Sequence, residues 1–208
     1  MGVTMLRRIR WAAYGLIAVV LVAVGAAWLR QDGPANLAGG VAVPGGVSVG
    51  GPFTLVHDHG KTVTDASFRG RWMLIYFGYT FCPDVCPTEL QTIAAALDRL
   101  GPLAAKVAPL FVTIDPARDT PAALAEYVKL FDDRLVGLTG TEAQIATVAK
   151  EYRVYYARSA SKESSSYLMD HSSFMYLVGP DGKFQALFRQ GTAAPDLADA
   201  LRARIGTS

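Results

Sequence analysis

The chain has 208 residues, of which 51% are hydrophobic and 18% charged, and its formal net charge is +2. This composition excludes an intrinsically disordered chain and a polybasic nucleic-acid binder, and two cysteines are too few for a disulfide framework. The positive charge belongs to residues 1–30, which contain four arginines and no acidic residue. It is therefore a signal of membrane topology and indicates nothing about ligands of the remaining chain.

Residues 11–29 contain no charged side chain, and as a helix they would be about 28 Å long, enough to cross the hydrocarbon core of a bilayer. Trp11 and Trp28 stand near the two ends, where indoles favour the membrane interface. The arginines before the stretch place residues 1–10 in the cytoplasm by the positive-inside rule. A cleaved signal peptide is the alternative, but its apolar region is usually about 7–15 residues long. We therefore expect a single-pass anchor in the inner membrane, with the C-terminal part on the periplasmic side.

Residues 30–51 are rich in Gly, Pro and other small residues and show no amphipathic period, which is typical of a flexible linker. Residues 52–208 then form a segment of ordinary single-domain size. The anchor and linker would leave this domain free to reach a partner in or on the same membrane.

Hydrophobic periodicity and turn residues predict alternating strands and helices within residues 52–208. The expected elements are a hairpin of 53–57 and 62–64, a buried strand at 72–77, a helix at 87–100, a buried strand at 107–114, a helix at 121–131, a short strand at 135–138, a helix from 141 toward 152, a hairpin of 173–178 and 183–189, and a helix at 195–204. This order predicts an α/β fold with a thioredoxin-like mixed sheet flanked by helices, preceded by one N-terminal transmembrane helix.

Both cysteines lie in the segment FGYTFCPDVCPTEL, between the first buried strand and the helix that follows it. Such strand-to-helix junctions are where α/β folds bind ligands, and a helix N-terminus lowers the pKa of a nearby thiol. Pro83 and Pro87 bias Cys82 and Cys86 away from helical backbone angles, so we expect both on a loop. We also expect a lowered pKa for at least one of the two thiols.

Three structural roles compete with a chemical role for this pair. A disulfide between Cys82 and Cys86 would close a short loop and be worth only about 2 kcal/mol. A structural zinc site normally needs four Cys or His ligands, and the chain has no second cysteine pair. Two unpaired buried cysteines would not be expected beside two prolines on a loop. Metal binding and thiol redox chemistry therefore remain open.

Two thiolates suit Cu(I), and an added imidazole would let the site also hold Cu(II). The chain has three histidines. His57 and His59 fall in the first hairpin, where exposed histidines are common, and we expect neither to be a ligand. His171 precedes a predicted inner strand, and by position alone it is more often a structural residue than a ligand.

Three segments together resemble the Sco/SenC family of membrane-anchored, thioredoxin-like copper proteins that assemble cytochrome c oxidase. They are YFGYTFCPDVCPTEL, VTIDPARDTP at 112–121 and DHSSFMYLVGPDGKF at 170–184. The resemblance covers the chain from about Phe53 to the C-terminus. It implies that Cys82 and Cys86 are a copper-binding, redox-active pair, that His171 is the third copper ligand, and that each chain binds one copper ion.

The resemblance also implies a function and a partner. The chain would deliver copper to the dinuclear copper site of cytochrome c oxidase subunit II, or reduce the cysteines of that site. A disulfide between Cys82 and Cys86 would discard the metal, so the two roles exclude each other at any one moment. An upstream copper donor or thiol reductant is a further expected partner. We do not expect the chain to be a turnover enzyme, and thiol–disulfide reduction is the one enzymatic activity that the resemblance leaves open.

Two aspartates in the second segment have competing interpretations. The resemblance implies that Asp115 assists the redox or transfer step, and an Asx-type turn before Pro116 is an equal alternative. Asp119 precedes a predicted helix, so we expect it to be a capping charge at the N-terminus of that helix.

Two other functions share part of this pattern. Residues 85–89 are similar to a peroxiredoxin active site, but that family needs a threonine three residues before its cysteine, where this chain has Pro83. The main alternative is a general extracytoplasmic thiol–disulfide oxidoreductase without a copper role. Those proteins have a two-residue spacer and a cis-proline facing the disulfide, whereas residues 169–174 contain His171 and no proline. A histidine facing two thiols serves a metal better than a peptide substrate.

Overall fold

The computed structural model describes residues 40–41, 49–159 and 167–206, together with residues 11, 14, 15, 17 and 19–22 near the N-terminus. The chain forms two units, Met1–Asn36 and Leu37–Ser208. In the first unit the described residues are helical, and the rings of Trp11 and Tyr14 meet edge to face at 6.3 Å. No helix within the described residues is both long enough and apolar enough to cross a membrane. Most of the expected anchor, the whole of residues 1–10 and most of the expected linker lie outside the described residues.

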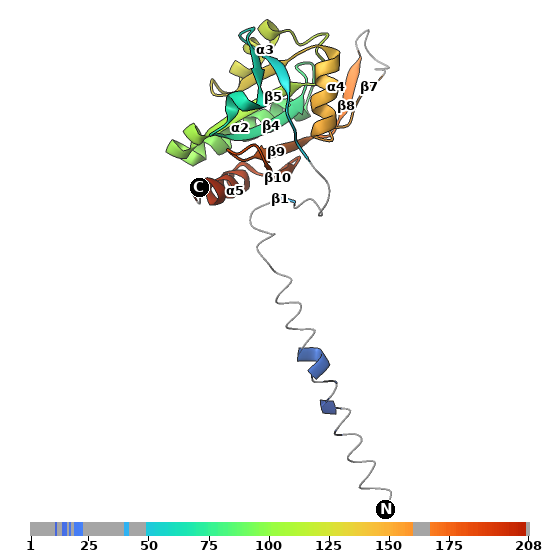
Figure 1. Cartoon of the computed structure of the whole chain (residues 1–208), viewed down its shortest axis with the longest axis vertical. Helices are drawn as coiled ribbons and strands as arrows, with labels where there is room; N and C mark the ends of the chain where they lie inside the picture. The colour runs from blue at the N-terminus through green and yellow to red at the C-terminus, as the bar shows by residue number, and fades with distance from the viewer. Residues whose placement is uncertain are drawn as a thin grey trace, which may run out of the picture. The chain divides into compact units, whose positions relative to one another are not determined.

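The second unit alternates strands and helices along the chain (Figure 1). Its elements are β1 (Gly40–Val41), β2 (Thr54–His57), β3 (Thr62–Thr64), the 3-10 helix η2 (Asp65–Phe68), β4 (Trp72–Gly78), α2 (Val85–Leu100), the 3-10 helix η3 (Gly101–Lys106), β5 (Val107–Thr113), α3 (Pro121–Lys129), β6 (Val136–Thr139), α4 (Glu142–Glu151), β7 (Tyr156–Ser159), β8 (Leu168–His171), β9 (Phe174–Val178), β10 (Phe184–Arg189) and α5 (Ala194–Ile205).

An eight-stranded mixed sheet forms the centre of this unit, in the order β1-β10-β9-β4-β5-β6-β2-β3. The strands β4, β5 and β6 are parallel, β9 runs antiparallel to β4, and β2 runs antiparallel to β6. Every residue of β4 and β5 is buried, as their continuous apolar sequences require of strands covered on both faces. β7 and β8 pair with each other in a separate two-stranded sheet.

Neighbouring residues of a strand point to opposite sides, so an apolar strand such as β4 or β5 has two faces to bury. Helices cover both of these faces. On one face Phe111 of β5 packs against Tyr127 of α3, with their ring centroids 5.6 Å apart. On the other face Phe77 of β4 packs against Tyr152, which directly follows α4, also at 5.6 Å. α2 and α5 lie side by side (Figure 1). This arrangement is the thioredoxin-like α/β fold expected from the sequence.

The predicted elements are found close to their expected bounds, with one consequential difference. α2 begins at Val85, two residues before Pro87, so Cys86 lies in the first helical turn and not on a loop. Proline is tolerated there because the first backbone N–H groups of a helix have no partner within the helix. Three short strands were not predicted: β1, which lies within the expected linker at 30–51 and pairs with β10, and β7 and β8, which are partly polar.

Candidate metal centre

The structure brings together the three side chains that the sequence analysis singled out. Cys82 lies in the loop that follows β4, Cys86 in the first turn of α2, and His171 at the end of β8. Their two sulfur atoms and one imidazole nitrogen all lie within 4.8 Å of one another. The Sγ atom of Cys86 is 3.5 Å from Nε2 of His171. These three atoms could therefore contact one ion with only small movements.

The sulfur of Cys82 lies at the N-terminus of α2. The backbone N–H of Cys86 donates a hydrogen bond to it at 3.3 Å, whereas the N-cap side chain, Asp84, makes no capping bond. Hydrogen bonds lower the pKa of Cys82 to about 4 and outweigh the opposite effect of its burial. The largest contribution comes from the Cys86 thiol, followed by His171 and backbone N–H groups. The expected thiol with a lowered pKa is thus Cys82, which is half-buried and carries a thiolate at neutral pH.

Cys86 is the opposite case, because its side chain is fully buried. Its hydrogen bond to Cys82, its burial and the negative charge on Cys82 all raise the pKa of its thiol. The hydroxyl of Tyr76 in β4 donates to the Cys86 sulfur at 3.8 Å. The pair therefore rests as one thiolate and one thiol, and the second proton would leave when a metal binds, since only thiolates are strong metal ligands.

The imidazole of His171 is oriented by its surroundings. Its Nδ1 lies 3.2 Å from the carbonyl oxygen of Ser172, and its Nε2 faces Cys86. When a metal replaces the hydrogen bond to Cys82, a proton held on Nδ1 would leave the lone pair of Nε2 for the metal. Tyr79 meets the imidazole edge to face at 6.0 Å, and its hydroxyl accepts a hydrogen bond from the backbone N–H of Met169 at 3.2 Å. Tyr79 therefore attaches β8, and with it His171, to the cysteine loop.

Asp115 is buried, but within the described residues no hydrogen bond or ion pair joins it to the sulfurs or to the imidazole. Its carboxylate accepts hydrogen bonds from Nε of Arg118 and, at 2.7 Å, from the hydroxyl of Tyr167. The side chain thus forms an ion pair in place of the Asx-type turn. The guanidinium of Arg118 lies over the exposed ring of Phe81 at 4.5 Å, and Phe81 directly precedes Cys82.

Asp119 does not cap α3, and that expectation was wrong. The N-cap is Thr120, whose hydroxyl accepts from the backbone N–H of Ala123 at 3.2 Å. Asp119 is fully buried and accepts three hydrogen bonds, from the N–H and hydroxyl of Thr80 and from the hydroxyl of Thr113. Burial raises the pKa of its carboxyl group. Asp119 therefore fastens the cysteine loop to the end of β5.

The residues that support the three candidate ligands were not predicted from the sequence. At Gly78, a Cβ atom would lie 2.8 Å from the Cys86 sulfur, so only glycine lets α2 approach β4 this closely. Tyr76 and Gly78 are two residues apart in a strand and therefore face the same side, toward α2. That alternation was the available signal. The contact of Tyr79 with β8 had no such signal in the sequence, because β8 itself was not predicted.

The sequence and fold of this chain are similar to those of known proteins. A family model described as SCO1/SenC matches residues 42–206. The human mitochondrial SCO1 homolog is 45% identical over 160 residues, covering 74% of this chain and 53% of that protein, so the chain spans about half the length of this relative. A crystal structure of Arabidopsis thaliana ScoI with copper bound has 42% identity and a TM-score of 0.73, covering 77% of this chain and 99% of that one. The Bradyrhizobium japonicum ScoI structure, also with copper bound, has 44% identity and a TM-score of 0.69, covering 74% of this chain and 98% of that one.

Proposed function

Since this chain belongs to the SCO1/SenC family, we propose that it binds copper through Cys82, Cys86 and His171 and delivers it to the dinuclear copper site of cytochrome c oxidase subunit II. The observation that carries the proposal is the convergence of two sulfurs and one imidazole nitrogen within 4.8 Å. Soft thiolates with one imidazole are a donor set suited to copper. The copper-bound relatives from Arabidopsis and Bradyrhizobium support the same ion.

In this proposal copper is the cargo. Two thiolates and one imidazole form a three-coordinate Cu(I) site, which leaves one side open to an incoming ligand. A pair of cysteines from the acceptor would enter there and replace the three ligands one at a time. Half-buried Cys82 is the accessible sulfur, whereas Cys86 is fully buried. Cys82 would therefore exchange early and Cys86 late.

The membrane anchor is part of the proposal. The apolar stretch at residues 11–29 would hold the chain in the inner membrane, with the linker at 30–51 and the folded domain on the periplasmic side. The domain would then share a compartment and a membrane with its acceptor, which raises their effective concentration.

We assign Asp115 a positioning role. It holds Arg118 through an ion pair, and Arg118 in turn lies over Phe81 beside the cysteine loop. On this account Asp115 touches neither the metal nor the reacting sulfurs. Replacing Asp115 by asparagine would alter the orientation of Phe81 and the rate of handover more than the affinity for copper.

Metal transfer tests the proposal directly. The copper-loaded full chain in detergent is mixed with a reduced soluble fragment of subunit II, and the metal in each protein is measured after separation. We expect copper to move to the fragment. The His171→Ala chain should bind copper far more weakly, because one of three ligands is lost. Retention of copper by the loaded chain, or His171→Ala binding as tight as in the parent, would contradict the proposal.

Thiol reduction is the second candidate function, and the lowered pKa of Cys82 favours it. The Cys82 thiolate would attack a disulfide in the partner and form a mixed disulfide, releasing one partner thiolate. Cys86 would then displace the second partner sulfur and leave a Cys82–Cys86 disulfide. The His171→Ala chain separates the two functions, because it retains both thiols. Reduction of an oxidised subunit II fragment by metal-free His171→Ala, together with no copper transfer from the loaded parent, would assign the chain to reduction.

A further inference from the structure

A second group of metal-binding side chains lies in the hairpin between β2 and β3. The ligand atoms of His57, Asp58 and His59 all lie within 4.8 Å of one another. Oδ1 of Asp58 is 2.5 Å from Nδ1 of His57 and 3.6 Å from Nδ1 of His59. The two imidazole rings are stacked, with centroids 4.9 Å apart. Three consecutive residues thus direct two nitrogens and one oxygen toward a common point.

The carboxylate of Asp58 is buried, with only 8% of the residue exposed, and one of its oxygens lacks a partner. Oδ2 accepts a hydrogen bond from the backbone N–H of Gly137 at 2.9 Å, whereas Oδ1 accepts none from the described residues. A buried carboxylate oxygen without a donor is costly. A positive charge at this point would remove that cost.

The nearest nitrogen to this oxygen is Nδ1 of His57. Nδ1 of His57 also accepts a hydrogen bond from the backbone N–H of His59 at 3.2 Å. The nitrogen and the carboxylate oxygen face each other at 2.5 Å. A cation held between these two atoms, whether a proton or a metal ion, would stabilise both.

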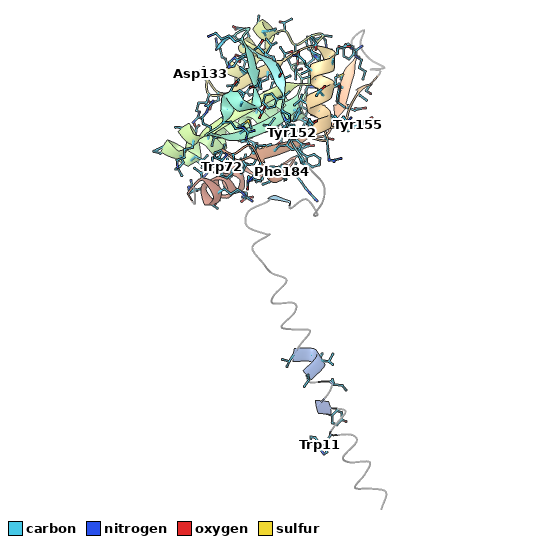
Figure 2. The ribbon with its side chains drawn as sticks, viewed as in Figure 1. Trp11, Trp72, Asp133, Tyr152, Tyr155 and Phe184 are labelled. Carbon is cyan, nitrogen blue, oxygen red and sulfur yellow. The ribbon has the colours of Figure 1, made fainter. Side chains whose placement is uncertain are left out.

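The hairpin cluster lies far from the cysteine site. β2 is antiparallel to β6, with His57 opposite Leu138, so the turn lies beyond the N-terminal end of β6. Cys82 instead follows the C-terminal end of β4, which is parallel to β5 and through it to β6. Asp133 lies beside the hairpin cluster, and Tyr155 is hydrogen-bonded to Ser172, which directly follows His171. Figure 2 shows these two labelled residues on opposite sides of the unit.

We propose that His57, Asp58 and His59 form a second metal site, which takes a divalent transition ion such as Cu(II) or Zn(II) in addition to the copper at the cysteines. Imidazole and carboxylate ligands suit borderline divalent ions, whereas the absence of thiolates disfavours Cu(I). The cluster borders a hollow of about 230 Å³ that Asp133 and Lys129 also line. The hollow and the solvent leave room for water as the remaining ligand. The positive charge of the Lys129 ammonium would weaken the binding of a cation here.

Copper(II) binding to the full chain in detergent tests the site. The parent for this test carries Cys82→Ser, Cys86→Ser and His171→Ala, so that the first site is absent. We expect it to bind one Cu(II) with an electron paramagnetic resonance spectrum of nitrogen and oxygen ligands. His59→Ala should weaken binding at least tenfold, and it does not threaten the fold because the His59 side chain is 69% exposed. Lys61→Ala, in the same hairpin, should bind as the parent does.

Two further measurements separate a metal site from a structural ion pair. Asp58→Asn retains an oxygen that can accept from Gly137, so the hairpin should remain folded while Cu(II) binding falls. Zn(II) should raise the unfolding temperature of the parent and not that of the His59→Ala chain. Cu(II) affinity that is unchanged by either His59→Ala or Asp58→Asn, or no Cu(II) binding by the parent, would overturn the proposal. The cluster would then be an imidazolium–carboxylate pair only.

Discussion

Replacing Gly78 by alanine should disturb the proposed copper site without removing any ligand. Gly78 ends β4, and the new Cβ would lie 2.8 Å from the Cys86 sulfur and 2.8 Å from Cε2 of Phe111. Nonbonded heavy atoms prefer separations of about 3.5–4.0 Å, so the sulfur and the ring would each have to move by about 1 Å. Because the Cys86 sulfur is now 3.5 Å from Nε2 of His171, such a shift would change the spacing of the ligands.

The size of the effect follows from overpacking and from metal-site geometry. An extra methyl group in a well-packed core typically costs about 1–3 kcal/mol. For a domain of this size each kcal/mol lowers the unfolding temperature by about 2–4 °C. Substitutions that disturb groups around metal ligands cost about 10–100-fold in affinity. We therefore expect the Gly78→Ala chain to unfold a few degrees below the parent and to bind Cu(I) at least tenfold more weakly.

The assay is a Cu(I) competition titration against a chelator of known affinity, together with thermal unfolding of the metal-free chain. Cys86→Ala supplies the matched background, because it removes the sulfur and leaves Phe111 in place. Gly78→Ala should destabilise the Cys86→Ala chain less than the parent, and the difference measures the share due to the sulfur. An equal cost in both backgrounds, with unchanged Cu(I) affinity, would refute the argument that Gly78 sets the position of Cys86.

Further predictions concern the two thiols and the buried carboxylate. Because the pKa of Cys82 is lowered to about 4, iodoacetamide should label it at a nearly constant rate from pH 6 to pH 9, whereas an ordinary thiol gains about tenfold per pH unit below its pKa of about 8.5. Labelling that rises only above pH 8.5 would contradict this, and Cys86 should stay unlabelled throughout. Since the folded-state pKa of Cys82 is below the unfolded one, its contribution to stability is fully present above about pH 8.5 and is lost as the pH falls toward 4. The free energy of unfolding of the reduced chain should therefore decrease over this range more steeply than that of Cys82→Ser, as pH-dependent urea titrations would show. Asp119→Ala removes the acceptor of three hydrogen bonds, two of them from Thr80, and should cost about 3 kcal/mol in urea unfolding, whereas Asp119→Asn, which keeps one acceptor oxygen, should cost less. Equal costs for the two Asp119 variants would show that these hydrogen bonds contribute little.

Local sequence determined the elements of this protein and the neighbourhood of its thiols. The apolar sequences of β4 and β5 predict strands buried on both faces, and α3 and α4 begin at or within one residue of their expected starts, after the N-caps Thr120 and Thr141. The position of the cysteines between a strand and a helix N-terminus predicted a lowered thiol pKa. These signals are local, because backbone propensity and capping involve residues only a few positions apart.

Tertiary structure decided which side chains meet. His171 reaches Cys86 from 85 positions further along the chain, on a strand that exists only because β7 pairs with it. The hydrogen bond between the two cysteines and the deeper burial of Cys86 decide which thiol ionises, and Gly78 lets α2 bring Cys86 close to β4. The close approach of Nδ1 of His57 to the Asp58 carboxylate likewise arises from the folding of the hairpin against β6. Burial and side-chain direction depend on register and packing between segments distant in the chain, and residue type and local periodicity do not contain that information.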